Sequence, residues 1–79
     1  MKTYKNMYYI TYKKPNNAAH YGTYTGGNTR EEAITTTLLD AVGFHNKYND
    51  DKLALRDLTI VECSLSGDYQ SVLRELERG

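Results

Sequence analysis

Apolar and polar positions alternate in the first third of the chain, a pattern typical of strands with one buried face. Residues 7–12 (MYYITY) are rich in aromatic and β-branched residues, the composition of a strand. One face of this strand carries Tyr8, Ile10 and Tyr12, and the other carries Met7, Tyr9 and Thr11. A turn signal at Pro15-Asn16-Asn17 precedes a second predicted strand over residues 20–25. The connection is too long to predict the register between the two strands.

Helical spacing replaces this alternation after the glycine pair at residues 26–27. Thr29 and Glu32 form a capping-box pattern, and acids in the first turn suit the helix dipole. The threonine run at 35–37 forms helix poorly, so packing must hold the helix. The helix either ends at Gly43 or continues to about Asn49, and we expect continuation. Its apolar stripe consists of Ile34, Leu38, Ala41 and Val42, extended by His45 and Tyr48.

The last third of the chain predicts one more strand and a short helix. Residues 58–64 (LTIVECS) are apolar on both faces, which favours a central strand. Residues 66–68 read as a turn, with Asp68 as the cap of an amphipathic helix. The order strand–strand–helix–strand–helix predicts an α+β fold, a small antiparallel sheet with helices packed on one face. At 79 residues, the chain is expected to form a single domain over 1–79.

Charge is divided unevenly along a chain whose net charge is zero. Residues 1–30 hold five basic residues and no acid, together with six of the eight tyrosines. All ten acids follow, beginning at Glu31. Such asymmetry often marks an interaction surface; the alternative is that the two halves lie side by side in a compact fold. The sequence has no apolar run of membrane-spanning length, and its single cysteine, Cys63, fits a reducing cytoplasm.

Groups that could carry chemistry are sparse. His20, His45 and Cys63 lack metal-ligand spacing, so we expect no metal and no cofactor. Cys63 lies inside a predicted strand, where cysteine is most often a small core residue. The glycine turn before Thr29 could hold an anion, but two glutamates in the next helical turn would repel it. The sequence therefore predicts a protein that is not an enzyme.

Two binding functions suit the tyrosine-rich hairpin. Lysines and stackable rings suit single-stranded nucleic acid, although the hairpin contains no arginine and no RNP-type motif. Tyrosine is equally enriched at protein interfaces, which makes the face with Met7, Tyr9, Thr11, Gly22 and Tyr24 a candidate contact surface. The predicted partner contacts are Tyr9, Tyr21, Tyr24, Lys13 and Lys14, with a secondary acidic patch of Glu31, Asp50 and Asp51. The alternative is that the tyrosine rings fill a thin core while their hydroxyl groups stay in contact with water.

Four segments carry a family resemblance: YYITY, HYGTYT, TREEAI and LTIVECSL, within residues 4–65. This plan of hairpin, helix and strand resembles small inhibitor proteins encoded by bacteriophages, the anti-CRISPR proteins among them. The resemblance implies a stoichiometric inhibitor in the host cytoplasm that blocks a host defence or nucleic-acid-processing complex by protein contacts. It transfers no functional residue by position. A homodimer formed through a free sheet face or edge is a further expectation.

Overall fold

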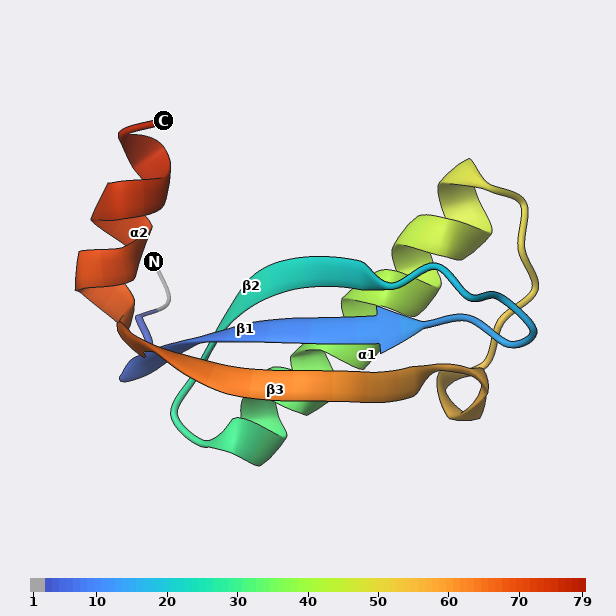
Figure 1. The fold of residues 1–79 in the computed structure, drawn as a ribbon, viewed down its shortest axis with the longest axis horizontal. Coiled ribbons are helices and arrows are strands. Elements are labelled where there is room, and N and C mark those ends of the chain that lie inside the picture. Colours follow the sequence, from blue (N-terminus) through green and yellow to red (C-terminus); the bar gives the residue numbers. More distant parts are fainter. Residues whose placement is uncertain (1–2) are drawn as a thin grey trace.

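The computed structural model describes residues 3–79, which fold as a three-stranded antiparallel sheet with two α-helices (Figure 1). The elements are β1 (Asn6–Lys13), β2 (Tyr21–Gly27), α1 (Arg30–Tyr48), a 3₁₀ turn (Leu55–Asp57), β3 (Thr59–Asp68) and α2 (Tyr69–Glu77). The strand order is β2-β1-β3. The α+β prediction and the element order are therefore confirmed.

The core lies between the sheet and α1, which crosses behind the strands in Figure 1. Tyr8, Ile10 and Tyr12 of β1 are all buried there, as their alternation predicts. Ala33 and Ala41 pack against them from α1. A sheet face covered by large rings leaves room mainly for small side chains on the facing helix.

This packing shifts the buried line of α1 relative to the predicted stripe. The helix buries Ala33, Thr37, Ala41 and His45, at a spacing of four, whereas Ile34, Leu38 and Val42 are half-buried beside that line. The helix passes through Gly43 and is capped at Asn49, which confirms the expected continuation. At its start, Thr29 Oγ1 accepts a hydrogen bond from Glu32 N at 3.1 Å, as the capping pattern predicts.

The prediction that residues 58–64 form the central strand is wrong, because β1 is central and β3 is an edge. The apolar residues of β3 misled the prediction: Val61 lies at a register shift between β1 and β3, and Leu65 is 64% exposed. The predicted turn at 66–68 is also wrong, because β3 continues to Asp68 and pairs it with Asn6. Asp68 nevertheless caps α2, accepting from Ser71 N at 3.2 Å.

The helix α2 packs across one end of the sheet rather than beside α1 (Figure 1). A Cβ built on Gly26 would lie 2.6 Å from the ring of Tyr69, on the face of β2 opposite Thr25. Thr25 bonds to Thr37 of α1, so α1 and the Tyr69 ring lie on opposite faces of the sheet. Away from this end, no described helix covers the second face.

Candidate functional site

The uncovered face of the sheet carries a pair of tyrosine rings. Tyr9 of β1 lies opposite Tyr24 of β2 in the strand register, and their ring centroids are 4.9 Å apart. The Tyr9 ring reaches over Gly22, where any Cβ would collide with its hydroxyl oxygen. Tyr24 is 45% exposed and Tyr9 is half-buried, so the pair presents aromatic surface to solvent. We call the face formed by Tyr9, Thr11, Lys13, Gly22 and Tyr24 the open face.

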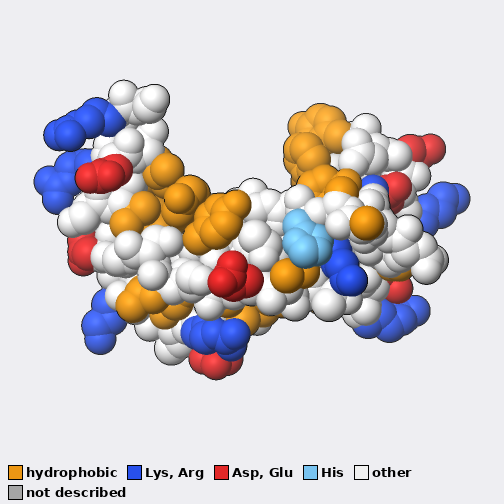
Figure 2. Space-filling view, in the orientation of Figure 1, with side chains coloured by type: hydrophobic (Ala, Val, Ile, Leu, Met, Phe, Trp, Pro, Cys, Tyr) orange, Lys and Arg blue, Asp and Glu red, His pale blue; other side chains and the backbone are white. Residues whose placement is uncertain are grey.

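Lys13 extends the open face along β1, because it lies two residues beyond Thr11 and four beyond Tyr9. Its side chain is exposed. Glu62 of β3 pairs with Thr11 and places one carboxylate beside them. Figure 2 views this side of the molecule: hydrophobic side chains gather near α2 and over the sheet, an acidic side chain lies near the centre, and a basic side chain lies beside the pale-blue histidine, while most other basic side chains lie toward the margins. The open face thus joins three predicted contacts, Tyr9, Tyr24 and Lys13.

Met7 was predicted to belong to this face, but it is buried at 3% exposure. It pairs with Gly26 and with Gly67, at the end of the sheet where α2 packs on β1 and β3. The amphipathic α2 therefore removes one end of the predicted contact surface from solvent.

Tyr21, Lys14 and Asp51 lie together on the opposite side, next to the core. Lys14 Nζ contacts Asp51 Oδ2 at 2.8 Å, and the hydrogen bond to Asp51 raises the pKa of Lys14. The Tyr21 ring stacks on Tyr12 with a centroid distance of 5.5 Å and meets the His45 ring edge-on. Each of these three predicted contacts therefore has a partner within the chain: Lys14 and Asp51 pair with each other, and Tyr21 packs on Tyr12 and His45.

The predicted acidic patch is divided between the two ends of α1. Glu31 lies in the first turn of the helix, and Asp50 and Asp51 follow its last residue. A helix of 19 residues is about 28 Å long, so these carboxylates cannot contact one partner group together. Asp50 is exposed and adopts φ of 57°, which makes it part of the turn that leaves the helix.

His45 is the most enclosed polar group of the core, with 1% exposure. Asn49 Nδ2 donates to its Nδ1 at 3.0 Å, so the ring proton lies on Nε2, which donates to Tyr12 Oη at 2.9 Å. Burial lowers the pKa of His45, and the charge of Lys14 lowers it further. Both ring nitrogens are occupied, which makes His45 a structural residue.

The remaining candidates for chemistry are dispersed. Burial raises the pKa of the half-buried Cys63 thiol, the opposite of what a nucleophilic cysteine needs. Within residues 3–79, no three His, Cys, Asp or Glu side chains are grouped as metal ligands.

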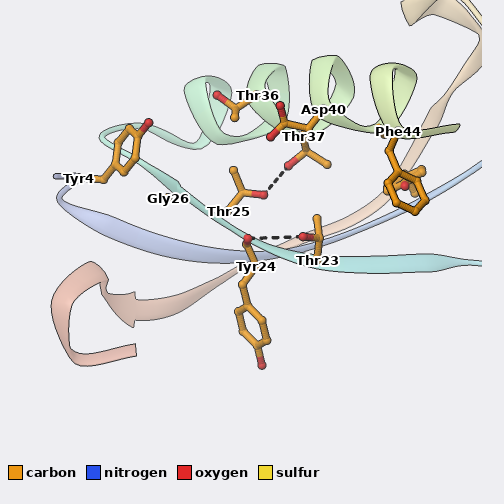
Figure 3. A pocket seen from close by; sticks show the side chains of 11 residues that line it. Tyr4, Thr23, Tyr24, Thr25, Gly26, Thr36, Thr37, Asp40 and Phe44 are labelled. Atoms are coloured by element: carbon orange, nitrogen blue, oxygen red, sulfur yellow. Dashed lines mark hydrogen bonds between the residues drawn. The ribbon is translucent and has the colours of Figure 1, made fainter. Parts of the chain in front are cut away.

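The sequence interpretation missed a groove between the edge strand β2 and the helix α1 (Figure 3). Its volume is about 390 Å³. The only indication in the sequence is the threonine run of α1, which we noted as dependent on packing. We call this feature the threonine groove, since its polar walls come from Thr23, Thr25, Thr36, Thr37 and Asp40.

Comparisons with protein-family models, with curated protein sequences and with solved structures gave no match to this chain. Across residues 3–79, neither α-helix combines the length and apolar character that crossing a membrane requires.

Proposed function

We propose that this chain is a non-enzymatic protein-binding domain that contacts its partner through the open face. The observation that carries the proposal is the exposed pair Tyr9 and Tyr24 on a sheet face that α1 leaves uncovered. A solvent-facing aromatic pair beside a lysine has the composition of a binding hot spot.

The partner we propose is a host protein or nucleoprotein complex, blocked by stoichiometric binding. This part of the proposal comes from the resemblance to phage-encoded inhibitors. An inhibitor of this kind needs an adhesive surface on a small rigid scaffold. The scaffold's regular β1–β2 pairing holds Tyr9 and Tyr24 in fixed positions.

Single-stranded nucleic acid is the second candidate, because paired tyrosine rings also stack on bases. The charges beside the rings favour nucleic acid less than they favour a protein partner. Lys14 is neutralised by Asp51, and Glu62 lies next to Thr11 on the open face, which leaves Lys13 as the lysine of that face. A nucleic-acid surface needs several cations along the strand's path.

Affinity capture from a bacterial lysate, with and without nuclease, tests the proposal when read by quantitative mass spectrometry. The test variant combines Tyr24→Ala with Lys13→Ala. The matched control combines Tyr48→Ala with Lys47→Ala, an exposed tyrosine and lysine on α1, where Lys47 Nζ lies 5.2 Å from the Tyr48 ring centroid.

We expect wild type and control to capture one nuclease-resistant complex in near-equal amounts, and the test variant to lose it. Capture that disappears with nuclease, and that weakens steeply with salt, would transfer the function to nucleic acid. If the test variant and the control lose capture to the same extent, the open face is not the contact surface.

A further inference from the structure

The strand β2 is an edge strand without the usual protection against pairing. Its register with β1 runs from Asn6↔Gly27 to Tyr12↔Tyr21 without a shift, and the strand contains neither a charged residue nor proline. The opposite edge, β3, has two register shifts against β1 and carries Glu62 and Asp68. Bulges and charges are the devices that keep sheet edges from pairing, so only β3 is guarded.

The threonine groove runs beside this unguarded edge. One wall comes from β2 with Thr23 and Thr25, and the other comes from α1 with Thr36, Thr37 and Asp40 (Figure 3). Thr25 and Thr37 are joined across it by a hydroxyl hydrogen bond of 2.8 Å. Within the described part of the chain, the one side-chain hydrogen bond to the β2 backbone is a 3.5 Å contact from Thr23 Oγ1 to Tyr24 O.

We infer that the threonine groove receives an extended segment of a partner protein, which pairs with β2 as a fourth strand and sets a Lys or Arg side chain against Asp40. Strand addition supplies backbone hydrogen bonds, and the groove between strand and helix receives alternate side chains of the added segment. The open face lies on the other side of β2. Tyr24 borders both surfaces, because it is among the residues that line the groove while Figure 3 shows its ring directed away from it.

Charge determines the side chain that the groove accepts. Asp40 is the one charged residue among those that line it, and its carboxylate is exposed. The only ion pair among residues 3–79 joins Lys14 and Asp51, so Asp40 has no cation of its own. The hydroxyls of Thr23 on β2 and Thr36 on α1 can accept hydrogen bonds from a lysine or arginine head group beside the carboxylate.

The shape around β2 favours a single strand over a second copy of the chain. In Figures 1 and 2, α2 and the C-terminal half of α1 both extend beyond β2 and leave a notch between them. A second sheet with its own helix layer would meet these two helices before its edge reached β2. The seven residues of β2 span about 23 Å, enough for an extended segment of similar length.

A phage-displayed library of random nine-residue peptides, selected on the wild-type chain, provides the probe. We expect the selected peptides to share a pattern in which every second side chain faces the groove, with Lys or Arg at one of the groove-facing positions. Each is then synthesised with N-methyl groups on odd or on even amides, and its binding is measured by fluorescence anisotropy. One methylation pattern should abolish binding and the other should preserve it, because only alternate amides of an added strand face β2.

Charge reversal adds a second measurement. Asp40→Lys should lower the affinity for a lysine-bearing peptide by about tenfold, as expected for the loss of a charge-assisted hydrogen bond. The affinity for the corresponding glutamate-bearing peptide should rise. Glu75→Lys, an exposed substitution on α2, is the control and should change neither. The Lys-to-Glu change in the peptide tests the same contact without altering the protein.

Failure to select any peptide, equal binding by both methylated forms, or loss of binding in Lys13→Ala, a substitution on the open face outside the groove, would each overturn the inference. A concentration-dependent dimer in sedimentation experiments that excludes the peptide would assign the edge to a second copy instead. None of these results depends on the lysate capture, so the groove and the open face can fail separately.

Discussion

Acidification should destabilise the fold through His45. The unfolded chain takes up a proton near the ordinary imidazole pKa of about 6.5. In the folded chain, burial lowers the pKa of His45, and Lys14 lowers it further against the smaller opposing effect of Asp51. A new proton on Nδ1 would also face the Asn49 amide that now donates there. The folded state therefore binds fewer protons below this pH, and stability falls as the pH falls.

The magnitude follows from proton linkage. A proton bound only by the unfolded chain changes the free energy of unfolding by about 1.4 kcal/mol per pH unit. Between about pH 7.5 and about pH 5.5, which brackets the ordinary value, the loss has an upper limit of about 1.4 kcal/mol. At roughly 4–8 °C per kcal/mol for a domain of this size, the thermal midpoint falls by about 6–11 °C at most.

Urea unfolding followed by circular dichroism at several pH values measures this loss. His45→Gln lacks the titrating ring and should flatten the profile between about pH 7.5 and about pH 5.5. His20→Gln is the matched control, because His20 is exposed and its replacement should leave the wild-type profile unchanged. Parallel profiles for wild type and His45→Gln would refute the assignment of the pH dependence to this buried ring.

Four further substitutions, used in two pairs, test the packing of the sheet and of α1. Gly26→Ala should cost about 1–3 kcal/mol, because the new Cβ would lie 2.5 and 2.6 Å from two tyrosine rings, whereas Gly43→Ala, with no atom within 4 Å, should stabilise α1 by about 0.5–1 kcal/mol. Thermal unfolding measures both variants. A change in stability of the same sign in Gly26→Ala and Gly43→Ala would contradict the described packing. Thr25→Val and Thr37→Val should each cost about 1 kcal/mol by leaving a hydroxyl unpaired, and the double variant should cost less than their sum in urea unfolding. Simple additivity would argue against the hydroxyl pair.

Local patterns in the sequence were sufficient to predict the order of the helices and strands and the buried face of β1. Alternation identifies which side chains of one strand share a face, and the capping pattern at Thr29 identifies where α1 begins. The prediction of β3 as central failed because apolar content does not determine strand order. That order depends on which strand has both neighbours paired, and β1 is that strand.

The candidate site was predictable only in part, because its residues are divided by contacts between distant positions. Alternation places Tyr9, Lys13 and Tyr24 on one face once the register is known. The ion pair between Lys14 and Asp51 joins residues 37 positions apart, and no local pattern indicates it. The threonine groove likewise needs β2 and α1 in place before its walls meet.

Hydroxyl-radical footprinting of the free and partner-bound chain tests the proposed binding face most directly. Oxidation of Tyr24 and Tyr9 should fall on binding, whereas that of Tyr48, exposed to 65% on α1, should not change. Protection of Tyr48 with unchanged oxidation of Tyr24 would contradict the account and place the partner on α1.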